Sequence, residues 1–151
     1  TFRNRVGEKV YSELKARGGK AASSKNCFYK QNSFEKKVED LLKSQGYDTI
    51  YSLVLNGECQ YDFRILETRI LIEAQGDYWH ANPSIDRYKD RDSLNIIQKK
   101  KIKQDAYKKR YAKKNGWIVI YVWEKDIREN NVGHFLKEVK DAYQIQTIRN
   151  K

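Results

Sequence analysis

Residues 117–123 restrict the fold of this chain more than any other segment, because they form a nearly continuous run of aromatic and β-branched residues. A strand with one covered face alternates apolar and polar side chains, whereas a strand covered on both faces shows an unbroken apolar run. The run therefore predicts a central strand with helices on both sides of its sheet. The chain has 151 residues, 39% of them hydrophobic, which is typical of one domain with a substantial core.

The residues before this run predict one helix and three strands. Asn32 and Glu35 have the spacing of a helix N-cap and its third helical residue, and apolar side chains follow at helical period until Gly46. Three strands that form an antiparallel meander are predicted at residues 50–55, 58–65 and 69–75. Asn56 and Gly57 favour a hairpin between the first two strands.

The remaining elements complete an α/β arrangement. After Pro83, a polar stretch leads to Ser93, a candidate N-cap for a long helix over residues 94–115 that Gly116 ends. A last amphipathic helix follows the apolar strand, and its apolar side chains are Val132, Phe135, Leu136, Val139 and Tyr143. The order helix, three-strand meander, helix, strand, helix predicts a three-layer α/β sandwich with a mixed central sheet.

The first 30 residues differ from the rest and predict a separate N-terminal segment. They are basic, and their pattern favours a short helix over residues 6–16 followed by a flexible link that begins at Gly18 and Gly19. We therefore divide the chain into this segment, residues 1–30, and a main domain, residues 31–151. Because the chain begins at Thr1 and contains no methionine, we expect it to be a fragment of a larger protein.

The net charge of +11 and the pI near 9.6 predict a polyanionic partner, most simply nucleic acid. No apolar run approaches the roughly 18 residues needed to span a bilayer, and no signal-peptide pattern opens the chain, so we expect no membrane association. Cys27 and Cys59 lie far apart without a Cys-x-x-Cys pair. This spacing disfavours a disulfide framework or a structural zinc and favours an intracellular, reducing location.

The predicted helix 94–115 is strongly basic and is the expected surface for the polyanion. Like charges four residues apart repel each other along a helix, and a bound polyanion relieves that repulsion. Lys101, Lys108 and Lys109 are therefore candidate phosphate contacts. Asp105 interrupts the basic series. It is either the intrahelical partner of these lysines or an inward residue that orients His80, and both interpretations stay open.

Chemically active side chains gather at residues 71–80, where an apolar strand runs directly into acid, amide, glycine, aromatic and imidazole groups. Glu73 ends the apolar run, and an unpaired buried acid costs several kcal/mol. Asp62 lies on the preceding strand, where alternation places it on the opposite face from Tyr61 and Phe63. Two carboxylates on adjacent strands suit Mg²⁺ with water completing its shell, although Asp62 alone is equally typical of a solvent-facing strand residue.

The aromatic and imidazole residues of this segment also have alternative interpretations. His80 either has a structural role or moves a proton, because imidazole titrates near neutral pH. Tyr78 and Trp79 are candidates for stacking on bases or wedging between them. Packing in the core or in a lid is the other interpretation of Trp79. His134 has no comparable cluster around it and is expected at the surface.

The chemistry-bearing residues occur in this order along the chain: Glu35, Asp62, Glu73-Ala74-Gln75-Gly76, Tyr78-Trp79-His80, Asp105, Gly116-Trp117 and Val122-Trp123-Glu124. The series resembles the very-short-patch-repair type of endonuclease, whose catalytic pattern is termed EDxHD. It is especially similar to the phage homing endonucleases that share this catalytic core within the PD-(D/E)xK nuclease superfamily. The resemblance covers about residues 32–125.

The resemblance implies a restriction-endonuclease-like fold and a metal-dependent endonuclease that acts on double-stranded DNA. Asp62 and a main-chain carbonyl near Ala74 would bind Mg²⁺, with Glu73 or Glu35 close to the metal and Mn²⁺ as an expected substitute. A dimer would suit double-strand cleavage, and the cytoplasm of a bacterial or phage-infected cell would be the location. His80 would act as the base or orient water.

The resemblance also implies that Asp105 supports His80, and the chain departs from the superfamily at a neighbouring position. The usual lysine after the second acid is replaced by Gln75, which cannot act as a cation. That duty would fall to His80 or to a lysine from elsewhere in the chain.

A second departure concerns zinc. Repair enzymes of this type carry a cysteine and histidine zinc site, whereas the flanking positions here hold Asp77, Ala81 and Asn82, so we expect no structural zinc. This favours a homing or other mobile-element endonuclease over a mismatch-repair nicking enzyme. The alternatives are a non-catalytic basic module that binds nucleic acid and a nuclease that acts on RNA.

Overall fold

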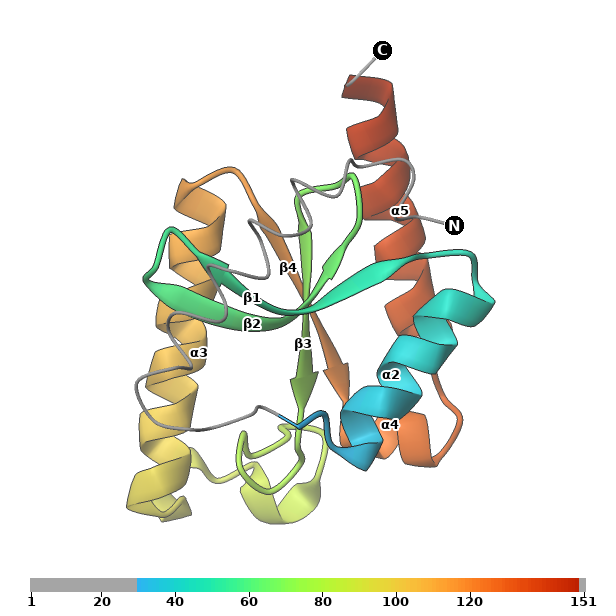
Figure 1. Ribbon diagram of the computed structural model, residues 1–151. Coiled ribbons are helices and arrows are strands. Elements are labelled where there is room, and N and C mark those ends of the chain that lie inside the picture. The colour runs from blue at the N-terminus through green and yellow to red at the C-terminus, as the bar shows by residue number, and fades with distance from the viewer. Residues whose placement is uncertain (1–29, 150–151) are drawn as a thin grey trace.

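The computed structural model describes residues 30–149, whose centre is a four-stranded mixed sheet (Figure 1). Its strands, in the order in which they lie side by side, are β1 (Thr49–Leu55), β2 (Cys59–Ile65), β3 (Ile70–Gln75) and β4 (Ile118–Trp123). The pairs β1–β2 and β2–β3 are antiparallel, whereas β3 and β4 are parallel. The predicted meander and the mixed sheet are confirmed.

Helices cover both faces of the sheet. The structure contains α2 (Ser33–Ser44), η2 (Asp86–Tyr88), η3 (Arg91–Ser93), α3 (Ile96–Lys114), α4 (Glu124–Arg128) and α5 (Gly133–Arg149). Figure 1 shows α3 on one side of the sheet and α2 and α5 on the other. The three-layer sandwich is confirmed, while α4 and the two short 3-10 helices were not predicted.

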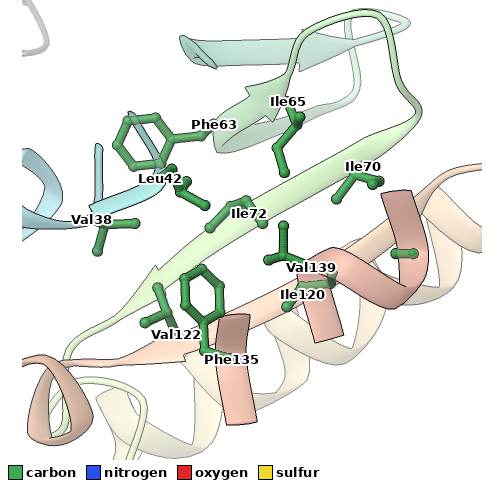
Figure 2. Packing of buried hydrophobic residues seen from close by; sticks show 11 residues of the cluster. Val38, Leu42, Phe63, Ile65, Ile70, Ile72, Ile120, Val122, Phe135 and Val139 are labelled. Atoms are coloured by element: carbon green, nitrogen blue, oxygen red, sulfur yellow. The ribbon is translucent and has the colours of Figure 1, made fainter. Parts of the chain in front are cut away.

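The two faces of β4 explain its apolar sequence. Ile120 and Val122 pack against the α5 side chain of Phe135, which Figure 2 shows among the residues of the larger core cluster. Val119 belongs to the other cluster, together with Ala112 of α3. The prediction that this strand is covered on both faces is confirmed, and the strand holds the outer layers to one sheet.

The predicted start of the long helix is wrong by two residues. The N-cap is Asn95, whose side chain accepts a hydrogen bond from the Gln98 N–H at 2.8 Å, while the Gln98 side chain accepts one from the Asn95 N–H at 3.2 Å. A capping box needs a glutamine or glutamate three residues after the cap. Asn95 has Gln98 at that position, whereas Ser93 has Ile96, so α3 begins at Ile96.

The β1–β2 hairpin changes sides of the sheet at Ser52 and Asp62. Phe63 packs in the cluster formed with α2 and α5, whereas Tyr61 packs in the cluster formed with α3. The prediction that Asp62 faces away from both aromatic residues is therefore wrong. The φ of 62° at Ser52 is left-handed and interrupts the alternation of an extended chain, although the strand register continues on both sides of it.

Several predictions from the sequence fall outside the described residues. These are the helix over residues 6–16, the link that follows it and Cys27. Cys59, the cysteine that is described, is a buried free thiol. Within residues 30–149, no helix combines the length and apolar composition that crossing a bilayer requires.

Candidate functional site

Two carboxylates meet near the end of β3, on the face of the sheet that α3 covers. Glu73 is 6% exposed, and the β2–β3 ladder has already ended at the pair Phe63 and Ile72. Beyond that point the Ala74 N–H donates to Oδ2 of Asp62 at 2.8 Å instead of to a main-chain carbonyl. This bond fixes the Asp62 side chain beside β3.

The electrostatics of Glu73 reflect its surroundings. Burial, followed by the neighbouring Asp62 carboxylate, raises the pKa of Glu73 to about 8, and the Lys108 ammonium opposes that shift. A stability-driven core would not place two acids together in this way, because both lose hydration and repel each other. The pair therefore marks a candidate cation site.

Lys108 of α3 supplies the cation that this pair has in the structure. Its Nζ forms an ion pair with Oε1 of Glu73, and its side chain is 25% exposed. The same Nζ lies 4.9 Å from the centre of the Tyr61 ring, and the Tyr61 hydroxyl donates to the Lys108 main-chain oxygen at 2.6 Å. Sequence reasoning treated Lys108 as a surface phosphate contact and missed this inward position.

His80 and Asp105 form a second pair on the same side of the sheet. Nδ1 of His80 lies 2.6 Å from Oδ2 of Asp105, and the two side chains are 18% and 17% exposed. In the described part of the chain, the Asp105 carboxylate pairs with His80 rather than with Lys101, Lys108 or Lys109. Of the two interpretations of Asp105, the structure shows the inward one.

Tyr121 links the two pairs. It lies opposite Glu73 in the β3–β4 register, and its hydroxyl donates to the Asp105 main-chain oxygen at 3.3 Å. Burial, then the charges of Asp105 and Glu73, raise the pKa of Tyr121 to about 12. The Tyr121 hydroxyl therefore stays protonated at neutral pH. No pattern in the sequence had indicated a role for Tyr121.

The loop that carries His80 is fastened by side chains. The His80 N–H donates to the Gly76 oxygen at 3.1 Å, which closes a tight turn directly after β3. Oδ1 of Asp77 accepts bonds from Nδ2 of Asn82 at 2.8 Å and from the Lys125 N–H at 3.2 Å. Asp77 and Asn82, at two of the positions expected to lack zinc ligands, thus hold the histidine loop against the start of α4.

Glu35 lines the same cleft as Asp62, whereas Gln75 is buried. Oε2 of Glu35 accepts bonds from the Asn32 N–H at 3.0 Å and from the Tyr51 hydroxyl at 2.9 Å. Glu35 shares a cleft of about 790 Å³ with Asp62 and with the α3 lysines. Gln75 is 1% exposed, and its Oε1 has no hydrogen-bond partner among the described residues.

The donor set fits a small divalent cation only in part. Across residues 30–149, no group of three or more His, Cys, Asp or Glu side chains gathers in a way that could hold a metal. Asp62 and Glu73 do meet, and Mg²⁺ is commonly held by one or two carboxylates while water and substrate oxygens fill its other positions. The pair fits such an ion, and Glu35 does not reach it as a third ligand.

The surface around the two pairs carries exposed aromatic and basic side chains. Tyr78 is 49% exposed and Trp79 53% exposed, so Trp79 is not a core residue. The two rings meet edge to face at 5.1 Å. Lys101 and Lys109 are exposed, in contrast to Lys108. His134 lies at the surface as predicted, where it pairs with Glu138.

Comparisons with known proteins identify a structural neighbour. No protein-family model matches the chain, and no curated protein matches its sequence. In structure, the chain is similar to the catalytic domain of the homing endonuclease I-Bth0305I, with a TM-score of 0.53 and 14% sequence identity. The similarity covers 76% of this chain and 97% of that domain. At this identity, the comparison shows a shared fold.

Proposed function

We propose that the chain is a metal-dependent endonuclease that hydrolyses phosphodiester bonds in double-stranded DNA. The observation that carries this proposal is the arrangement at the end of β3, where Asp62 meets Glu73 and where Tyr121, the register partner of Glu73, bonds to the main chain of Asp105, the partner of His80. A cation site and an oriented imidazole are the two parts that phosphodiester hydrolysis needs. The fold shared with a homing endonuclease domain supports the proposal.

His80 would be the general base of the reaction. Its Nδ1 faces the Asp105 carboxylate, so a neutral ring carries its proton on Nδ1 and leaves the lone pair of Nε2 to accept a proton from the attacking water. The imidazolium that forms is stabilised by the carboxylate on its other nitrogen. Asp105 is therefore a positioning residue for the His80 ring. The bond from the His80 N–H to the Gly76 oxygen positions the main chain of the same residue.

Asp62 and Glu73 would hold the divalent cation. When bound, Mg²⁺ or Mn²⁺ supplies charge stabilisation at the scissile phosphate and acidifies the attacking water. Asp62 is aimed by its bond to the Ala74 N–H, and Glu73 is fixed by burial. Gln75 is buried, so it contributes to the packing around β3 rather than contacting the substrate.

DNA would lie over α3 and the histidine loop. Exposed lysines of α3 would contact phosphates, while Tyr78 and Trp79 stand beside His80 with about half of their surface free to stack on bases. The structural role of Asp77 and Asn82 supports a homing or mobile-element enzyme over a zinc-containing mismatch-repair enzyme. A dimer would suit coordinated cleavage of both strands.

Cleavage of supercoiled and linear DNA with and without Mg²⁺ tests the proposal. The wild-type chain should cut in Mg²⁺ and not in a chelator, and Asp62→Asn should lose cleavage while DNA binding persists. Asparagine keeps an acceptor for the Ala74 N–H and removes the charge that holds the cation. Asp40→Asn on α2, where Asp40 pairs with Lys36 at the surface, is the matched control and should cut normally.

Three results would contradict the proposal or redirect it. If the chain binds DNA but never cuts in Mg²⁺ or Mn²⁺, it is a binding module whose acids are incidental. If Asp62→Asn cuts as fast as the wild-type chain, the cation site is wrongly placed. Cleavage of RNA in preference to DNA would identify the substrate as RNA.

A further inference from the structure

Lys108 differs from the other lysines of α3 because Tyr61 contacts both its main-chain oxygen and its ammonium group. The Tyr61 hydroxyl holds its main-chain oxygen at 2.6 Å, and the Tyr61 ring lies 4.9 Å from its ammonium nitrogen. Tyr61 itself is fully buried. A lysine side chain usually extends its charge into water, so this arrangement directs the charge inward instead.

The Lys108 ammonium points toward Glu73. The ammonium forms an ion pair with Oε1 of Glu73, and that side chain is 7% exposed. In residues 30–149, Lys108 is the side chain that forms an ion pair with Glu73. A buried acid beside a second acid needs a cation, and the ammonium meets that need in the protein alone.

The ammonium therefore neutralises a carboxylate oxygen that a divalent cation would need. A carboxylate oxygen that is paired with an ammonium is a weaker metal ligand, because the pair must be broken before the metal can bind. Lys108 also lines the 790 Å³ cleft that contains Asp62, so its side chain has open space on its other side.

We propose that Lys108 and the divalent cation compete for Glu73, and that metal binding releases the Lys108 ammonium into the cleft, where it contacts a phosphate of the bound nucleic acid. The second half of this statement rests on the proposed nuclease function, whereas the competition does not. Lys108 would thus balance the acid pair before the metal arrives and bind the substrate afterwards.

Metal titration of the chain without DNA tests the competition. Isothermal titration calorimetry with Mn²⁺ above pH 8, where Glu73 is ionised in both chains, should show that Lys108→Met binds the ion roughly tenfold more tightly than the wild-type chain, because the competing charge is gone. Lys108→Arg keeps the charge and should bind no more tightly than wild type. Lys140→Met removes an exposed lysine of α5, across the sheet, and should leave the affinity unchanged.

Weaker Mn²⁺ binding by Lys108→Met would indicate that Lys108 has a structural role and does not compete with the metal. If Lys108 only holds the site together, Lys108→Met should bind Mn²⁺ more weakly, and either this or an unchanged affinity would overturn the proposal. Should Lys108→Met fail to fold, the NMR signals of lysine side chains in the wild-type chain give the same answer. Added Mg²⁺ should shift the Lys108 signal, identified by its loss in Lys108→Arg, and a Lys108 signal that stays in place would also overturn it.

The release onto phosphate is measured by DNA affinity in a His80→Ala background, which keeps the duplex intact. Adding Mg²⁺ should steepen the dependence of log K on log salt by about one more unit when Lys108 is present than in Lys108→Gln. An equal change in both would overturn the phosphate contact. If tighter Mn²⁺ binding by Lys108→Met is found in a chain that never cuts DNA, the competition stands and the proposed function falls.

Discussion

Nδ1 of His80 lies 2.6 Å from Oδ2 of Asp105, although the two residues are 25 positions apart in the sequence. One comes from the fastened loop after β3 and the other from the inward face of α3, so the packing of α3 on the sheet decides whether they meet. A carboxylate at this distance fixes the tautomer and the orientation of the ring. The two side chains should therefore act as one unit in any proton transfer.

We expect His80→Ala and Asp105→Asn each to slow single-turnover DNA cleavage by roughly 10²-fold or more, which is the usual contribution of general acid or base groups. The double variant should be little slower than the poorer single variant, since both changes remove the same step. Single-turnover rates measured over a range of pH give the comparison. His134→Ala is the matched control, because His134 is exposed and pairs with Glu138, away from the site.

Two results would separate the residues. Fully multiplicative losses in the double variant would show that His80 and Asp105 act independently. A pH profile that Asp105→Asn leaves unaltered would show that the carboxylate does not tune the imidazole, and Asp105 would then have only a packing role in α3.

The raised pKa of Glu73 predicts how stability depends on pH. Its ordinary value is 4.5, and in the folded chain burial and then Asp62 raise the pKa of Glu73 to about 8. Between these values the folded state holds more protons than the unfolded state, so this contribution to stability is fully present below about pH 4.5 and is lost as pH rises toward 8. One proton accounts for at most about 1.4 kcal/mol per pH unit.

Urea unfolding in a metal chelator at several pH values between about 5 and 8 tests this sign. The wild-type chain should lose stability across the window, and Glu73→Gln should remove that part of the slope because the amide does not titrate. Glu67→Gln makes the same chemical change at an exposed position in the turn between β2 and β3 and should follow the wild-type curve. Parallel curves for wild type and Glu73→Gln would contradict the assignment.

The elements of this fold could be predicted from sequence because their signals are local. The apolar run of β4, the turn at Asn56 and Gly57, and the N-cap of α2 each act within a few residues. The start of α3 was misplaced because Ser93 resembles a cap, while the glutamine that decides the cap stands three residues after Asn95. A rule that weighs both halves of the capping box would have found it.

The site was harder to predict, because its contacts depend on tertiary packing. The left-handed backbone at Ser52 turns the hairpin and sets the direction of Asp62, and serine gives no warning of that conformation. Lys108 stands three residues after Asp105 and four before the buried Ala112, whereas Lys109 stands four after and three before. Helical spacing therefore placed both lysines near the inward face of α3 and could not tell which one turns toward Glu73.

Burial of Lys108 changes which lysines should carry the electrostatic affinity for DNA. Lys101 and Lys109 are exposed, so replacing both with alanine should reduce the slope of log K against log salt by about two. Fluorescence anisotropy with one duplex over a salt series measures this. The matched control replaces Lys137 and Lys140, which are exposed on α5 across the sheet. An equal reduction of the slope by both double variants would show that DNA does not bind preferentially to α3.

Trp79 is expected to stack on a base of the bound DNA. Its side chain is 53% exposed and stands directly before His80, so a base beside it would also be close to the proposed reaction centre. Stacking on an aromatic side chain contributes about 1–3 kcal/mol per base, so Trp79→Ala should weaken DNA binding by roughly 5- to 150-fold, whereas Trp79→Phe, which keeps an aromatic face, should lose less. The thermal stability of Trp79→Ala should change little, because the substitution opens no cavity in the core.

Ile145→Ala, which truncates a 50% exposed apolar residue of α5, is the control for loss of exposed apolar surface. Equal DNA affinities for wild type, Trp79→Ala and Ile145→Ala would show that the exposed tryptophan takes no part in DNA binding.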